Sequence, residues 1–98
     1  MKKIHTDKAP KAIGPYSQAV HHHHFVFTSG QIPLNPETGV LVTDNFKAEV
    51  LQVLSNLDAV LTASGSSLKK VAKLTVFLTD LSNFSELNEV FNTYFDEH

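Results

Sequence analysis

The sequence contains no cysteine and no arginine, and each absence excludes a kind of chemistry. Without cysteine, the 98 residues cannot form a disulfide, supply a thiol nucleophile or bind zinc through thiolates. Without arginine, they cannot grip a carboxylate with the two parallel hydrogen bonds of a guanidinium group. An anionic or carbonyl-bearing ligand would have to be held by lysines, hydroxyls or backbone amides instead.

Neither charge nor hydropathy indicates a nucleic acid or a membrane as a partner. The net charge is -2, and there is no polybasic segment. No apolar run is long enough to cross a bilayer. The lysines of Met1–His5 are followed by the polar Thr6–Lys8, where a signal peptide would need an apolar stretch. These features favour one small cytoplasmic domain, and the 42% hydrophobic content allows a modest core.

The hydrophobic pattern predicts an α+β fold that begins with strands. Two strands are expected at Tyr16–Val20 and Phe25–Thr28, joined as a hairpin by the four residues His21–His24. A third short strand is expected at Val40–Val42, after turn-forming residues.

The second half of the chain predicts a helix, a strand and another helix. Apolar residues follow one helical face from Phe46 to Leu61, with Asp44 as the expected N-cap and Gly65 as the expected end. The strand Val71–Thr79 should place one apolar face against that helix, namely Ala72, Leu74, Val76 and Leu78. A second helix should begin near Asn83 with a capping box to Glu86, and should run to His98. Its expected apolar face comprises Phe84, Leu87, Val90, Phe91, Tyr94 and Phe95.

Two segments have the pattern expected for one wall of a small-molecule pocket. In the first, Ile13–Val20, the turn-forming Gly14-Pro15 delivers Tyr16, an aromatic residue with a hydroxyl group. In the second, Phe25–Pro33, an apolar strand breaks at Ser29 and Gly30, where a glycine lets backbone N–H groups approach a ligand. The alternative interpretation is two hairpin strands with ordinary turn residues.

The run His21–His24 raises the question of a metal site. Adjacent residues of a strand point to opposite faces, whereas metal ligands converge on one centre. We therefore expect no physiological metal here, and a solvated turn that gains charge below about pH 6.5 is the simpler interpretation.

The two segments of the expected pocket wall, together with several further segments, resemble the reactive intermediate deaminase family, also called RidA or YjgF. The resemblance rests on Ile13–Val20 and Phe25–Pro33 and continues through the segments Asn35–Gly39, Ala63–Gly65, Val71–Leu81 and Phe84–Phe91. It covers nearly the whole chain.

The resemblance implies a fold and an activity. The fold would be RidA-like (chorismate-mutase-like), with a mixed β-sheet, two helices on one face and the order β-β-β-α-β-α. Family members hydrolyse enamines and imines such as 2-aminoacrylate, 2-iminopropanoate and 2-iminobutanoate to 2-oxo acids and ammonia, without a cofactor. The resemblance further implies a homotrimer with sites between subunits. Its substrate-binding residues would be Tyr16, Ser29, Gly30 and Asn88.

The chain departs from the family pattern at its C-terminal end. Family members continue for roughly another quarter of their length, with an arginine that grips the substrate carboxylate and a glutamate that positions water. Neither residue has a counterpart here, so residues 1–98 are interpreted as a single, C-terminally incomplete domain in which no catalytic residue is identified. The alternative is a non-catalytic relative that binds or senses a small metabolite. Protein quality control or translation interference ranks below both.

Overall fold

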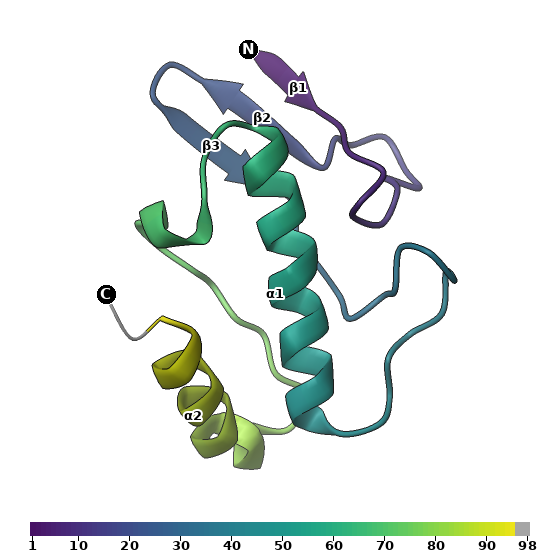
Figure 1. The fold of residues 1–98 in the computed structure, drawn as a ribbon, viewed down its shortest axis with the longest axis vertical. Helices are drawn as coiled ribbons and strands as arrows, with labels where there is room; N and C mark the ends of the chain where they lie inside the picture. The colour runs from purple at the N-terminus through teal and green to yellow at the C-terminus, as the bar shows by residue number, and fades with distance from the viewer. Residues whose placement is uncertain (96–98) are drawn as a thin grey trace.

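Three strands from the first third of the chain form one antiparallel sheet. The computed structural model describes residues 1–95, and its elements are, in chain order, β1 (Lys2–Ile4), β2 (Ala19–His22), β3 (Phe25–Thr28), α1 (Phe46–Ala63), η1 (Leu68–Lys70), η2 (Leu81–Asn83) and α2 (Phe84–Tyr94). The sheet order is β1-β2-β3, and both pairings are antiparallel (Figure 1). The predicted RidA-like α+β architecture is confirmed, although its sheet is antiparallel rather than mixed within the described residues.

The hairpin between β2 and β3 is tighter than predicted. Its pairing continues to His22, which lies opposite Phe25, so only His23 and His24 form the turn. The prediction of a four-residue connection is therefore wrong, because His21 and His22 belong to β2. His23 has a φ of 54°, in the left-handed region that non-glycine residues rarely adopt. The first predicted strand is also displaced, since β2 begins at Ala19 rather than at Tyr16.

Two of the predicted strands do not form within the described residues. In the segment Val40–Val42, only Leu41 makes an isolated bridge, to Leu34. The segment Val71–Thr79 makes no ladder; of its predicted apolar face, Leu78 packs against the buried residues shared by α1 and α2, whereas Leu74 is 36% exposed. An extended segment becomes a strand only beside a neighbour that accepts and donates its hydrogen bonds. No such neighbour lies beside residues 71–79 in the part of the chain that is described.

The long helix α1 forms where its periodicity predicts, with a cap one residue later than expected. Asn45, not Asp44, is the N-cap, and its Oδ1 accepts a hydrogen bond from the backbone N–H of Ala48 at 2.8 Å. Gly65 ends the helix as predicted, with a φ of 84° that glycine adopts without strain.

The helix α1 is the central element of the molecule, since it packs on the sheet with one end and on α2 with the other (Figure 1). Near its C-terminal end, Val60 is buried against Ile4 and Ala19. Near its N-terminal end, Leu54 is buried against Leu87 and Val90 of α2. The expected layer of two helices on one sheet face is therefore realised mainly by α1, with α2 beside it.

The second helix begins as expected but is capped differently. The short helix η2 precedes it, and the Asp80 carboxylate accepts a hydrogen bond from the Ser82 N–H at 2.9 Å. Hydrogen bonding to the Ser82 side chain, and secondarily to this N–H, lowers the pKa of Asp80 below its ordinary value. The predicted capping box is wrong, because the side chain of Asn83 makes no cap hydrogen bond. The prediction that this helix runs to His98 lies outside the described residues. Among those residues, no helix combines the length and apolar character needed to cross a bilayer.

Candidate functional site

The turn before β2 positions the ring of Tyr16. The Tyr16 N–H donates to the Gly14 carbonyl at 2.8 Å, which closes a tight turn around Pro15. A Cβ atom on Gly14 would lie 3.2 Å from Cε2 of the Tyr16 ring, so a larger residue there would require the ring to shift by a few tenths of an ångström. The residue is about half exposed (51%), so the tyrosine is not part of the core.

Ser29 is fixed to the neighbouring segment by two hydrogen bonds. Its N–H donates to the Gln18 carbonyl at 2.9 Å, and its Oγ donates to the Ser17 carbonyl at 2.5 Å. These bonds bring Ser29 beside the residue that follows Tyr16. Because the hydroxyl hydrogen is already used, Ser29 Oγ can offer only its lone pairs, as an acceptor, to a ligand.

The two residues after Ser29 carry unused backbone donors. The N–H groups of Gly30 and Gln31 make no hydrogen bond within residues 1–95. Gly30 does not adopt a left-handed φ, so its backbone conformation does not itself require a glycine. A Cβ atom there would meet nothing within 4 Å. A β-branched side chain can therefore be introduced at this position, where we expect it to hinder the approach of a ligand to the amides.

Together these groups suit a small ligand that has both an oxygen and an N–H. The amides of Gly30 and Gln31 can donate to a carboxylate or carbonyl oxygen, and Ser29 Oγ can accept from an N–H. The Tyr16 hydroxyl adds a group that can do either. No charged side chain is needed for this arrangement, in keeping with the absence of arginine.

The fourth predicted site residue lies on a different element. Asn88 belongs to α2, which packs against the N-terminal half of α1 (Figure 1). Its side chain is exposed, and no hydrogen bond joins it to Tyr16, Ser29 or Gly30 within the described residues. The structure thus joins the segment that follows Tyr16 to Ser29 and Gly30, with Asn88 on a separate element, and the binding roles of all four residues stay predictions.

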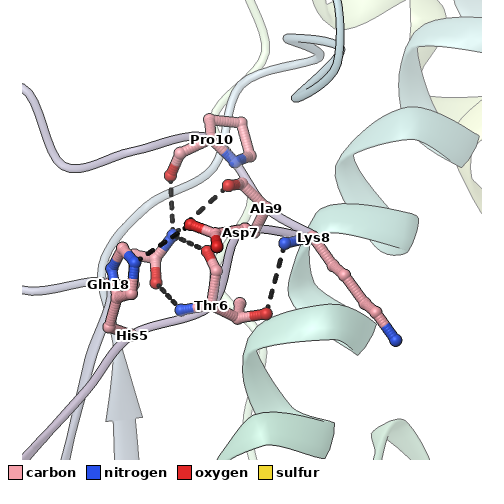
Figure 2. Close-up of polar contacts among 7 residues, drawn as sticks. All are labelled: His5, Thr6, Asp7, Lys8, Ala9, Pro10 and Gln18. Carbon is pink, nitrogen blue, oxygen red and sulfur yellow. Dashed lines mark hydrogen bonds and ion pairs between the residues drawn. The ribbon is translucent and has the colours of Figure 1, made fainter.

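Our sequence reasoning missed Gln18, a buried amide that holds the N-terminal segment. Gln18 is 2% exposed; its Oε1 accepts from the Thr6 N–H at 2.6 Å. Its Nε2 donates to the carbonyls of Thr6 and Pro10 at 2.9 and 2.8 Å, as Figure 2 shows, with a longer contact of 3.4 Å to Ala9. While this side chain holds residues 6–10, the main-chain carbonyl of Gln18 holds Ser29.

Our reasoning also missed Asn56, a fully buried amide on α1. It contacts the segment that follows Gly30. A polar residue at a position that the helical pattern buries was the available signal, because Val53 and Val60 flank Asn56 at three and four residues along the same face.

A hollow of about 410 Å³ lies elsewhere, between the Thr6–Lys8 segment and α1. Asp58 and Thr62 contribute to its helical wall. None of the predicted site residues lines it, and it is open to solvent. We place the candidate site at Ser29–Gln31 instead, because free amides and a fixed hydroxyl are groups that bind a ligand, whereas a hollow alone shows only space.

The histidine run provides no converging ligand set. The rings of His22 and His23 contact edge to face, with centroids 4.2 Å apart. In the part of the chain that the structure describes, no three histidine, aspartate or glutamate side chains come together as a metal site would require.

Comparisons with known proteins agree with this fold. The family described as Endoribonuclease L-PSP matches residues 6–98. The chain is 49% identical to a RutC family protein of Pyrococcus abyssi, over 96% of this chain and 74% of that protein. It is 48% identical to TdcF of Escherichia coli K12, provisionally named a reactive intermediate deaminase, over 100% of this chain and 76% of TdcF.

Solved structures give the same result. The crystal structure of Escherichia coli TdcF with bound serine superimposes with a TM-score of 0.93 and 45% identity, covering 100% of this chain and 76% of TdcF. RidA from an Antarctic Psychrobacter superimposes with a TM-score of 0.89 and 49% identity, over 95% of this chain and 75% of that one. The chain is thus a small α+β protein of the reactive intermediate deaminase type. It belongs to the RidA/YjgF family, and it spans about three quarters of the length of these relatives.

Proposed function

We propose that this protein takes part in the hydrolysis of reactive enamines and imines derived from amino acids, such as 2-aminoacrylate, 2-iminopropanoate and 2-iminobutanoate. The observation that carries the proposal is the pair of free amides at Gly30 and Gln31 beside the fixed hydroxyl of Ser29. The crystal structure of TdcF with bound serine supports it, because serine has the carboxylate and the amino group that such an arrangement suits.

The proposed reaction needs only binding, orientation and water. The amides of Gly30 and Gln31 hold the substrate carboxylate, and Ser29 Oγ accepts a hydrogen bond from the imine N–H. Water adds to the imine carbon, the C–N bond breaks, and the products are a 2-oxo acid and ammonia. No cofactor and no covalent intermediate is required.

The wall formed by Ser29, Gly30 and Gln31 is only one part of the proposed site. The arginine and glutamate that the family resemblance implies have no counterpart in these 98 residues. Two charge-assisted hydrogen bonds to the carboxylate, each worth roughly 1.5 to 3 kcal/mol, are therefore missing from this part of the site. A homotrimer with sites between subunits is part of the proposal, and a neighbouring subunit would then bring its Asn88 or other groups to the wall.

Acceleration of ammonia release from freshly generated 2-aminoacrylate tests the activity. The matched variants are Gly30→Val, which covers the amide, and Thr62→Val, which changes a side chain in the distant hollow. We expect Gly30→Val to fold, since the space is open, and to lose the acceleration while Thr62→Val keeps it. Equal activity in both variants would contradict the placement of the site.

A second function is favoured by one specific observation, the absence of arginine. A relative that binds a small metabolite without converting it, as a sensor or regulator, would need the amide wall but not the carboxylate clamp. A folded sample that binds 2-oxobutanoate at Gly30 yet does not accelerate ammonia release would favour this function over the enzymatic one. Native mass spectrometry of the same sample reports whether the trimer forms.

A further inference from the structure

Asn56 is an unusually constrained polar residue for the interior of a helix. Its side chain is 0% exposed, and all of its polar atoms have partners. Nδ2 donates to the carbonyls of Ile32 and Leu34 at 3.2 and 2.9 Å, and Oδ1 accepts from Gln52 Nε2 at 2.9 Å. A helix side chain therefore holds the main chain of a segment more than twenty residues earlier in the sequence.

Asn56 supplies donors that this segment does not obtain from a β-ladder. Pro33 has no N–H, and the Leu34 N–H closes a tight turn onto the Ile32 carbonyl at 2.7 Å. The chain has left β3 at Thr28, and among the described residues no strand supplies N–H groups to the carbonyls of Ile32 and Leu34. The Asn56 amide therefore gives the Leu34 carbonyl its donor and the Ile32 carbonyl a second one.

The result is a short bridge fixed at both ends. On one side, Ser29 is held by the carbonyls of Ser17 and Gln18. On the other, Ile32 is held by Asn56. Gly30 and Gln31 lie between these two anchored residues and make no backbone N–H hydrogen bond of their own within residues 1–95.

We propose that Asn56 is a positioning residue that sets the orientation of the Gly30 and Gln31 amides for ligand binding. This inference rests on the proposed function for its catalytic consequence, but its structural part stands on the contacts alone. Pre-orientation of the donors lowers the ordering cost of binding. Asn56 touches no ligand itself and acts through the carbonyls of Ile32 and Leu34.

The sharpest variant is Asn56→Asp, which keeps the shape of the side chain but removes both donated hydrogens. Asn56→Ser keeps one short donor and is the conservative variant. The control is Val50→Ala, which removes buried apolar contacts at the other end of α1 and leaves the amide in place. Amide exchange at Leu34, Asn35 and Val42, whose N–H groups are hydrogen-bonded within the segment, reports its stability. ¹⁵N order parameters of Gly30 and Gln31 report its rigidity.

We expect Asn56→Asp to speed exchange at these three amides at least tenfold, a change of about 1.4 kcal/mol, and to lower the order parameters of Gly30 and Gln31. Asn56→Ser should give a smaller change. In Val50→Ala, amide exchange in this segment should be no faster than in the rest of the chain. If Asn56→Asp does not fold, Asn56→Ser against Val50→Ala decides the question. Unchanged exchange and order parameters in the serine variant would overturn the proposal.

The kinetic consequence separates this inference from the proposed function. Loss of ground-state positioning should raise KM or Kd at least tenfold with little change in kcat. Faster segment motion with unchanged binding at Gly30 would overturn the positioning role and leave the site intact. Faster motion together with no ligand binding in the unmodified protein would overturn the proposed function and leave the anchoring by Asn56 standing.

Discussion

The sequence pattern predicts strands both in the β2–β3 hairpin and in the segment Val71–Thr79, yet of these two only the hairpin is a strand pair within the described residues. The hairpin finds its partner across a turn of two residues, which makes the loop-closure cost small. The segment 71–79 has no partner in residues 1–95, and Phe77 within it is 92% exposed. Alternation of apolar and polar residues therefore indicates a segment that is able to pair, whereas a β-ladder also requires a neighbouring strand within reach.

The buried contact between α1 and α2 and the chain just after the segment 71–79 should differ most in the stability lost when a leucine is shortened to alanine. Leu54 is 1% exposed in the contact between α1 and α2, and Leu81 is 78% exposed just after the unpaired segment. We expect Leu54→Ala to lower the free energy of unfolding by about 2–5 kcal/mol, because it leaves a cavity. The matched Leu81→Ala should change it by no more than about 0.5 kcal/mol. Denaturant unfolding measures both.

A similar loss of unfolding free energy in the two variants would contradict this comparison. It would mean that the segment around Leu81 is packed in solution against a surface that residues 1–95 do not provide.

The second test concerns the polar anchor on the hairpin side. Gln18→Leu leaves the Thr6 N–H and the carbonyls of Thr6 and Pro10 without their partner. Each buried polar group left unpaired costs about 1–3 kcal/mol, so we expect a loss of about 2–4 kcal/mol in unfolding free energy. Gln52→Leu is the control, since it gives up only the bond to Asn56 and should cost about 1 kcal/mol. Equal costs would show that the amide of Gln18 is not the anchor.

These anchors mark the limit of what the sequence could predict. The helix α1, its end at Gly65 and the β2–β3 hairpin follow from local patterns, and the structure confirms them. The hydrogen bonds by which Gln18 and Asn56 hold other segments of the chain join residues 8 to 24 positions apart, and no local pattern encodes such partners. The same reason explains the error at Val71–Thr79, where pairing depends on a distant neighbour. Tyr16, Ser29 and Gly30 were found through family resemblance, and the free amide of Gln31 only through the structure.

The third test concerns the backbone conformation of the hairpin turn. His23 adopts a left-handed conformation, which costs a non-glycine residue roughly 1–2 kcal/mol. His23→Gly should therefore raise the unfolding free energy by about 0.5–1 kcal/mol after the entropic cost of glycine is included. His24→Gly, at a position without a left-handed φ, should give no gain. Thermal unfolding of the two variants compares them, and a gain from His24→Gly alone would contradict the turn geometry.

The smallest effect is expected at α2, in alkaline solution. Partial burial, and secondarily the negative charge of Asp58, raise the pKa of Tyr94 above its ordinary value of 10.0. The folded state then keeps the phenol proton after the unfolded state has lost it, so stability falls as pH rises past about 10. Tyr94→Phe should remove that part of the alkaline loss in urea unfolding between about pH 9 and 11. An identical pH dependence in the variant would show that folding does not raise the pKa of the Tyr94 phenol.

The most direct test of the central claim is a ¹H–¹⁵N titration of the 98-residue chain with 2-oxobutanoate, following the amides of Gly30 and Gln31. We expect both signals to shift together and to saturate, with smaller shifts at Ser29 and Tyr16, and no such response in Gly30→Val. Shifts confined to Thr6, Lys8 and Asp58, or none at Gly30 and Gln31 in the folded protein, would contradict the placement of the ligand wall.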